Sequence, residues 1–99
     1  MQQSKFIALE KAIILHKRIQ TVKFPAYLKN QILRASLSIA LNLSEGAAKT
    51  SKKDKMRFYN IAFASLRETQ VAIRCHNKDI PEIKALADEL GAILYKLTS

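Results

Sequence analysis

The chain has 99 residues, enough for one domain and too few for two. Hydrophobic residues make up 48% of it and charged residues 25%, the balance of a folded globular protein rather than of a disordered tail. Two glycines and two prolines supply few of the tight turns that an all-β fold needs. No apolar run approaches the roughly 18 residues of a membrane span, and no signal peptide stands out. With Cys75 as the single cysteine, we expect one cytoplasmic, reduced domain over residues 1–99, with no membrane contact.

The strongest compositional signal is charge. Seventeen Lys and Arg residues oppose eight Asp and Glu residues, a net charge of +9. Residues 51–79 hold seven basic and three acidic residues, whereas residues 80–99 hold two and three, which leaves the last quarter outside the positive region. Because self-repulsion opposes such a charge, we interpret it as attraction for phosphate groups or for an acidic partner. A basic surface that only keeps the protein soluble is the alternative.

Apolar residues at three- and four-residue spacing predict a first helix over Ser4–Val22, with Ser4 as its N-cap. The helix should stop before Phe24 and Pro25, because a residue that precedes proline is driven out of the α region. Pro25 suits the first turn of a second helix, and Gly46 suits its C-terminal stop.

A third helix is predicted from Ser51, which would cap the backbone of Asp54, to about His76. Asp79 would then cap a fourth helix. The apolar stripe of this helix predicts the bundle seam and consists of Ile83, Leu86, Ala87, Leu90, Ile93, Leu94 and Leu97. Short connections make successive helices antiparallel neighbours. The fold class expected is therefore all-α, an antiparallel up-down-up-down four-helix bundle.

The second helix carries two apolar faces where a monomeric bundle needs one stripe. One face contains Leu28, Ile32, Ala35, Ile39 and Leu43, and the opposite face contains Leu33, Leu37, Ala40 and Leu41. This surplus predicts either deep burial or a subunit interface. The far side of the third helix combines cations and aromatic rings, namely Lys52, Tyr59, Phe63, Arg67, Gln70 and Arg74. Such a side can bind nucleic acid through charge and stacking, or it can pack on a neighbouring subunit.

No catalytic pattern is recognisable in the sequence. His16 falls on the apolar side of the first helix, which favours a half-buried histidine with its hydrogen bonds satisfied. His76 adjoins Cys75, but neighbours on a helix do not share a face, and no further Cys or His stands at zinc-ligand spacing. Gly-rich phosphate loops and nucleophile elbows are missing as well. We expect no enzyme, no metal and no cofactor.

Two linked motifs carry a family resemblance. The stretch QILRASLSIALNLSEG (Gln31–Gly46) resembles the "QLRRAAVSIPSNIAEG" signature of the four-helix-bundle proteins encoded in intervening sequences of bacterial 23S rRNA genes. The stretch SKKDKMRFYNIAFASLRE (Ser51–Glu68) is similar to that family's "SKKEFIRFLNIALGSLAE". Phe24 and Pro25 also stand where the family has them.

The resemblance implies a small homo-oligomer, a pentameric barrel of bundles, with a basic surface that binds nucleic acid. Relatives of the fold serve as accessory proteins to reverse transcriptases in diversity-generating retroelements. This chain departs from the family pattern at Leu33, Ala40, Leu41 and Ala64. Since Leu33 and Leu41 enlarge the second apolar face of the second helix, these departures favour a protein partner there.

The polar residues of the two motifs predict a structural network between the second and third helices. Its members are Arg34, Ser38, Asn42, Glu45, Ser65 and Glu68. Polar groups inside a bundle need partners, so Arg34 should pair with Glu68 or Glu45, and Asn42 should bridge the helices. Such a network would fix helix register more than it adds stability.

The function predicted from these patterns is non-enzymatic binding of nucleic acid, RNA rather than DNA, by a symmetric homo-oligomer. The phosphate-binding residues expected are Lys49, Lys52, Lys53, Lys55, Arg57, Arg67 and Arg74. The subunit interface expected contains Leu33, Leu37, Leu41, Tyr59 and Phe63. The alternative is an interaction module that docks on a protein such as a reverse transcriptase through the apolar face of the second helix.

Overall fold

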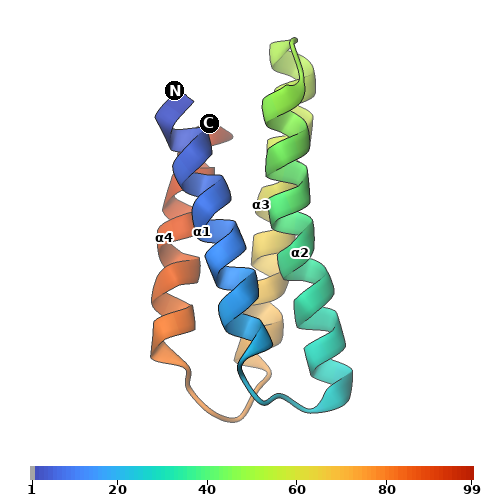
Figure 1. The fold of residues 1–99 in the computed structure, drawn as a ribbon, viewed down its shortest axis with the longest axis vertical. Helices are drawn as coiled ribbons and strands as arrows, with labels where there is room; N and C mark the ends of the chain where they lie inside the picture. The colour runs from blue at the N-terminus through green and yellow to red at the C-terminus, as the bar shows by residue number, and fades with distance from the viewer. Residues whose placement is uncertain (1) are drawn as a thin grey trace.

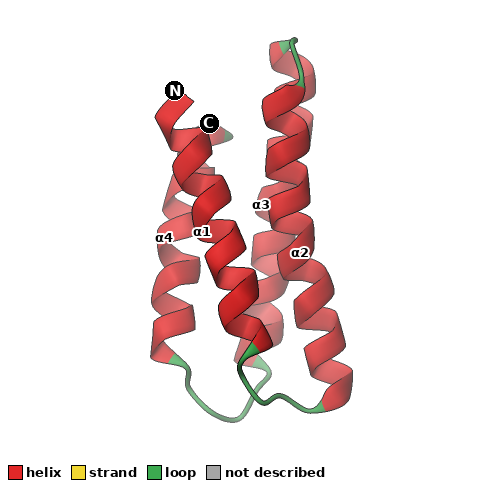
Figure 2. Ribbon diagram, viewed as in Figure 1, coloured by secondary structure: helices red, strands yellow, loops and turns green. Residues whose placement is uncertain are grey.

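The computed structural model describes residues 2–99, with side chains from Ser4 onward. It contains four α-helices: α1 (Gln2–Gln20), α2 (Ala26–Ala48), α3 (Lys52–Arg74) and α4 (Pro81–Leu97). They run alternately up and down, and α1 and α3 each pack against both α2 and α4 (Figure 1). Short loops join them (Figure 2). The predicted all-α, four-helix architecture is confirmed.

The connection between α1 and α2 is closed by local hydrogen bonds. Lys29 Nζ donates to the carbonyl oxygens of Gln20 (3.1 Å) and Val22 (2.9 Å), which no longer have helical partners. Pro25 precedes α2, and its carbonyl oxygen accepts from the Leu28 and Lys29 N–H groups. The predicted start of α1 was wrong, because the helix already includes Gln2 and Ser4 therefore lies within it.

Gly46 does not end α2, contrary to the sequence prediction, since the helix continues to Ala48. Its role is close packing rather than conformational freedom. A Cβ atom added at Gly46 would lie 2.7 Å from Tyr59 Cε1 and 3.1 Å from Phe58 Cβ. The absent side chain thus lets α3 approach α2 closely, with the Tyr59 ring buried against the glycine.

The ends of α3 and α4 agree with the sequence in part. Ser51 Oγ accepts from the Asp54 N–H at 3.1 Å, which confirms the predicted cap. α3 ends at Arg74, so His76 lies outside it. The His76 ring packs edge-on against the Phe24 ring, with 4.8 Å between the ring centres. Asp79 does not cap α4: Ile80 takes that position without a side-chain bond, and Pro81 occupies the first turn, where no N–H partner is needed.

One continuous core joins the four helices. Its largest fully buried apolar side chains are Leu15, Ile19, Ile32, Ile39, Leu66, Leu90 and Leu94. The predicted seam of α4 is confirmed, with Ile83, Ala87, Leu90 and Leu94 buried and the rest of the stripe packed at its margin. Full burial of one such large side chain contributes about 1.5–3 kcal/mol.

At one end of the bundle, α2 and α3 project beyond α1 and α4 (Figure 1). The connection of residues 49–51 closes this hairpin. The projecting end therefore presents the residues that surround the start of α3 to solvent on several sides.

Candidate nucleic-acid interface

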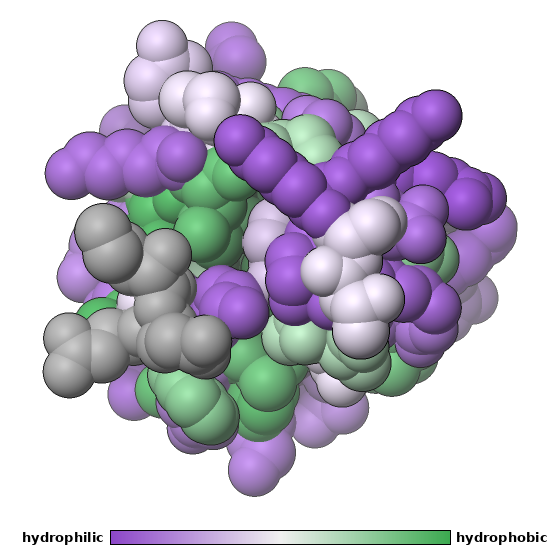
Figure 3. Space-filling view, turned by 90° about the horizontal axis from the view of Figure 1, so that it is seen from above, coloured by the Kyte–Doolittle hydropathy of each residue, from purple (hydrophilic) through white to green (hydrophobic). Residues whose placement is uncertain are grey.

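The projecting α2–α3 end carries the densest basic cluster of the chain. We call this cluster the basic tip, and it consists of Lys49, Lys52, Lys53, Lys55 and Arg57. Seen from above, long hydrophilic side chains gather over the α2–α3 end (Figure 3). The sequence predicted these residues as phosphate contacts, and the structure brings them together within one connection and two helical turns.

Phe58 organises two of the cations of the basic tip. Lys49 Nζ lies 5.2 Å from the centre of the Phe58 ring, and Arg57 Cζ lies 5.4 Å from it. Lys49 also pairs with Glu45 at 3.1 Å, one helical turn earlier. A cation above an aromatic face is attracted by the ring's quadrupole, so Phe58 orders charged groups that are otherwise solvated.

Lys55 lies close to a second lysine, Lys5. Lys55 Nζ donates to the Ala47 carbonyl at 3.2 Å, at the end of α2. Desolvation, followed by the charge of Lys5 on α1, lowers the pKa of Lys55. Two lysines at close range repel each other, and an anion between them would relieve that repulsion.

Lys52, Lys53 and Arg57 make no ion pair with a carboxylate in the described residues. Together with Met56 and Asn60 they form an open, shallow surface over the first turns of α3. The positive end of the α3 dipole lies here as well, and it favours anions over cations. The site is thus positive from both side chains and backbone, and it can hold phosphate.

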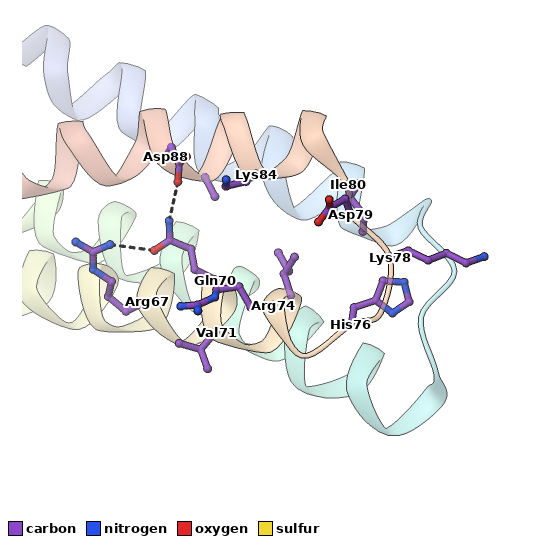
Figure 4. A pocket seen from close by; sticks show the side chains of 12 residues that line it. Arg67, Gln70, Val71, Arg74, His76, Lys78, Asp79, Ile80, Lys84 and Asp88 are labelled. Carbon is purple, nitrogen blue, oxygen red and sulfur yellow. Dashed lines mark hydrogen bonds between the residues drawn. The ribbon is translucent and has the colours of Figure 1, made fainter.

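Arg67 and Arg74, which the sequence also predicted as phosphate contacts, lie apart from the basic tip. At the helical rise, Arg67 lies about 22 Å and Arg74 about 33 Å from Lys52 along α3. Both line a separate groove between α3 and α4, about 580 Å³ in volume (Figure 4). The groove also contains Lys78 and Lys84, with Asp79 and Asp88 as its acidic residues.

Arg67 is held in place by Phe63 and Gln70. Its guanidinium lies 4.7 Å from the centre of the Phe63 ring. Arg67 Nη1 donates to Gln70 Oε1 at 3.1 Å, and Gln70 Nε2 donates to Asp88 Oδ1 at 3.3 Å (Figure 4). These contacts join α3 to α4 and fix one edge of the guanidinium, leaving its other N–H groups for a ligand.

The structure forms the neutral part of the predicted polar network. The hydroxyl oxygens of Ser38 and Ser65 lie 2.8 Å apart, between α2 and α3. Asn42 Nδ2 donates to the Ser38 carbonyl (2.9 Å) and to Ser38 Oγ (3.1 Å). Both bonds stay within α2, so the prediction that Asn42 bridges the two helices was wrong, and the Ser38 hydroxyl makes the contact with α3 instead. Thr69, which was not predicted as a member of the network, donates from Oγ1 to the Ser65 carbonyl at 2.8 Å. Its position one turn after Ser65 was the available signal, because threonine hydroxyls often bond the carbonyl four residues earlier.

The ionic part of that prediction was wrong. Arg34, Glu45 and Glu68 are exposed, and Glu45 pairs with Lys49 instead of Arg34. Neither Arg34 nor Glu68 forms an ion pair within residues 2–99. Their sector lies at the outer edge of the α2–α3 contact, where long side chains reach water without losing hydration. They need no buried partner.

His16 is half-buried between α1 and α2, as the sequence indicated. Its Nδ1 lies 2.7 Å from Ser36 Oγ, and its Nε2 lies 3.2 Å from Gln20 Nε2. Since Gln20 can only donate from that nitrogen, the network assigns the hydrogen to Nδ1, which donates to Ser36. Ser36 in turn donates to the Leu33 carbonyl at 3.3 Å. This chain satisfies a neutral imidazole, and burial lowers the pKa of His16.

The predicted interface residues divide into two groups. Leu37 and Leu41 are 43% and 59% exposed, and Leu33 packs on the core from their side of α2. Tyr59 is a correction: it is 5% exposed, because it turns toward Gly46 rather than outward. Phe63 is half-buried beneath Arg67.

Within residues 2–99, no three His, Cys, Asp or Glu side chains come together as metal ligands would. None of the helices described combines the length and the apolar character that crossing a membrane requires.

Comparison with known proteins assigns the chain to a family. The family model of the 23S rRNA-intervening sequence protein matches residues 4–96. The chain belongs to this family. Its residues 31–68, which hold both motifs quoted above, lie inside the match.

A solved structure shares the fold. It is a protein of unknown function from the S23 ribosomal protein family of Bacteroides thetaiotaomicron, with a TM-score of 0.78 and 20% sequence identity, covering 96% of this chain and 97% of that one. At this identity the likeness shows the four-helix fold alone. No curated protein matches the chain. Neither the family's description nor that of the solved structure names a catalytic activity.

Proposed function

We propose that this protein binds RNA in the cytoplasm through phosphate contacts made by the basic tip, without catalysing a reaction. The observation that carries the proposal is the position of the cluster. Lys52, Lys53 and Lys55 stand in the first turn of α3, where the helix dipole disfavours cations by typically 0.3–1 kcal/mol each. A ligand that brings negative charge to the same place turns this unfavourable arrangement into a binding site.

Two further features support RNA as the ligand. The net charge of +9 attracts any polyanion at long range, and the α2–α3 end projects beyond α1 and α4, which leaves its loop and the start of α3 accessible to a nucleic-acid backbone. The family takes its description from an intervening sequence of 23S rRNA, which associates these proteins with an RNA gene.

The salt dependence of RNA affinity tests the proposal. Each phosphate contact contributes about −0.7 to −0.9 to the slope of log affinity against log salt concentration. Replacing Lys52, Lys53 and Lys55 with glutamine should therefore flatten the slope by about two to three units and weaken binding to all sequences alike. Fluorescence anisotropy with labelled RNA at several salt concentrations measures both.

A matched variant separates the basic tip from net charge. Lys17, Lys23 and Lys78 are exposed at the opposite end of the bundle, and their replacement by glutamine removes the same three charges. For this control, the slope of log affinity against log salt concentration should differ from the wild-type slope by no more than the contribution of one phosphate contact, about 0.7 to 0.9. Equal losses in the two triple variants, with both folded by circular dichroism, would contradict a defined site at the basic tip.

The proposal includes self-association through an apolar face on α1 and α2. Leu37 and Leu41 on α2 and Phe6 on α1 are exposed, while Leu9 and Ile13 pack on the core between them. Where exposed apolar side chains form a contiguous patch, the patch often marks an interaction site. We propose a homo-oligomer, and the family resemblance points to a pentamer, which would repeat the basic tip around one symmetry axis.

The same exposed leucines favour a second candidate function, an interaction module that docks on a reverse transcriptase through the α2 face. Salt distinguishes the two functions. Phosphate binding weakens steeply as salt is added, whereas an apolar contact persists. Capture of the enzyme at high salt, by a protein that shows no RNA binding at low salt, would establish the docking module instead.

A further inference from the structure

Beyond the basic tip, the side of the molecule formed by α3 and α4 contains a smaller hollow of about 450 Å³. Its walls include Arg67 and Gln70 from α3 and Asp88, Tyr95 and Lys96 from α4. Gly91 lies between them, so this part of the wall carries no side chain. We call this feature the Tyr95 hollow.

Tyr95 points away from the core. It is 65% exposed, whereas the preceding residue Leu94 is fully buried, so the Tyr95 ring adds little to the core. An exposed aromatic ring beside a cavity offers a flat surface on which a nucleobase can stack. Base stacking of this kind does not depend on sequence, because every base has a π-face.

The basic side chains of the Tyr95 hollow are positioned to bind phosphate. Arg67 is ordered by the Phe63 ring and by Gln70, so little side-chain entropy is lost when it binds a ligand. Its free N–H groups can make a paired contact with phosphate oxygens. Lys96 supplies a second positive charge on the α4 wall of the hollow.

We propose that the Tyr95 hollow binds one unpaired nucleotide of RNA, with the base stacked on Tyr95 and a phosphate held by Arg67 and Lys96. Bases inside a duplex are already stacked, so this site selects loops, bulges and single strands. Asp88 repels a phosphate placed against it, but its carboxylate can accept a hydrogen bond from a ribose hydroxyl. The inference rests on the proposed RNA-binding function but uses different residues, of which Arg67 lies about 22 Å along α3 from Lys52.

Two RNA probes at low salt test this site: a labelled oligouridylate of about 10 nucleotides and a duplex of about 16 base pairs. Tyr95→Ala should weaken oligouridylate binding about fivefold or more, with an unchanged salt slope, because stacking carries no charge. Duplex affinity should stay within about twofold, since the duplex bases remain stacked. Tyr95→Phe, which keeps the ring, should bind as the wild type.

Two further variants assign the roles. Arg67→Gln should weaken oligouridylate binding and flatten its salt slope by about 0.7, the value of one contact on a single strand. Tyr27 is the matched control, because it is 73% exposed at the start of α2 and lines none of the hollows described here. Tyr27→Ala should change neither affinity.

The outcomes separate this inference from the proposed function. If Tyr95→Ala binds both probes as the wild type does, while the triple glutamine variant of the basic tip loses them, the hollow is not a nucleotide site and the basic tip remains one. Equal losses for Tyr95→Ala and Tyr27→Ala, or an equal loss on duplex and oligouridylate, also overturn the inference. A wild-type protein that binds neither probe overturns both proposals.

Discussion

Two glycines inside helices show how packing decides the effect of a single atom. An alanine Cβ at Gly46 would lie 2.7 Å from Tyr59 Cε1, whereas one at Gly91 would meet only Leu66 Cδ2 at 3.5 Å. Alanine gains about 0.8–1 kcal/mol over glycine within a helix, while overpacking costs about 1–3 kcal/mol. We therefore expect Gly91→Ala to stabilise the fold by about 0.5–1 kcal/mol and Gly46→Ala to destabilise it by about 1–2 kcal/mol.

Urea denaturation of the two alanine variants measures this difference in the free energy of unfolding. If Gly46→Ala stabilised the protein as much as Gly91→Ala does, the Tyr59 ring would be free to move away, and the close α2–α3 contact would not be a constraint. The sequence placed Gly46 near the end of a helix, but it could not reveal this contact, because Tyr59 belongs to another helix.

His16 makes stability depend on pH. Burial lowers its pKa in the folded protein below the ordinary value of 6.5, so the unfolded chain binds the proton first as the pH falls. The stabilising contribution of the neutral side chain is complete above pH 6.5 and is lost as the pH falls from there toward the lower folded pKa. We expect the free energy of unfolding to decrease steadily over that range.

Chemical denaturation at a series of pH values checks the His16 prediction. His16→Gln carries no titrating group at this position and should show a flatter profile over the same range. An identical decline in wild type and His16→Gln would assign the pH dependence to other groups.

At the scale of elements, the predicted polar network between α2 and α3 reduces to one neutral hydrogen bond across the helices, between Ser38 and Ser65. Ser65→Ala removes the partner of Ser38 and should cost about 0.5–1.5 kcal/mol, the net value of a typical intramolecular hydrogen bond. Glu68→Ala, three residues along α3, should change stability by no more than about 0.5 kcal/mol, because Glu68 is exposed. A larger loss for Glu68→Ala than for Ser65→Ala in denaturant titrations would restore the ionic network.

The sequence predicted the existence and order of the four helices because their apolar periodicity is long and regular. It predicted their ends less well. Ser4 and Asp79 are residues that often cap helices, yet the chain before Ser4 is already helical, and Pro81 starts α4 with no side-chain cap at Ile80. A capping residue indicates where a helix can begin, whereas packing and neighbouring residues decide where it does begin.

For the whole molecule, the part of the candidate site whose residues are neighbours in the sequence could be predicted, whereas the part that folding brings together could not. The basic tip is a short stretch around the start of α3, so a count of charges along the chain finds it. The α3–α4 groove combines Arg67 and Arg74 with Lys84, and the neighbouring Tyr95 hollow contains Lys96; both lysines come from a quarter of the chain that carries a net negative charge. The net charge of residues 80–99 did not reveal this positive surface. It includes Glu82 and Glu89 of α4, which pair with Arg18 and Lys11 of α1 rather than with the cations of the groove.

The proposed self-association of the protein can be measured on the whole molecule. We expect light scattering to give a mass that is a multiple of the 11.2 kDa chain, with the apolar α1–α2 face buried between subunits. Leu37→Lys would place an unpaired charge in that interface, a penalty of several kcal/mol that should leave a folded monomer. Ile61, which is 40% exposed on α3 against 43% for Leu37, is the matched control. Ile61→Lys should keep the wild-type mass.

The two lysine variants distinguish the surfaces that could hold an oligomer together. Dissociation by Ile61→Lys but not by Leu37→Lys would move the interface from α2 to α3 and place it next to the basic tip. A wild-type mass of 11.2 kDa would contradict self-association altogether. The exposed leucines of α2 would then be free for a different protein, since a symmetric contact between copies and a docked partner would compete for the same face.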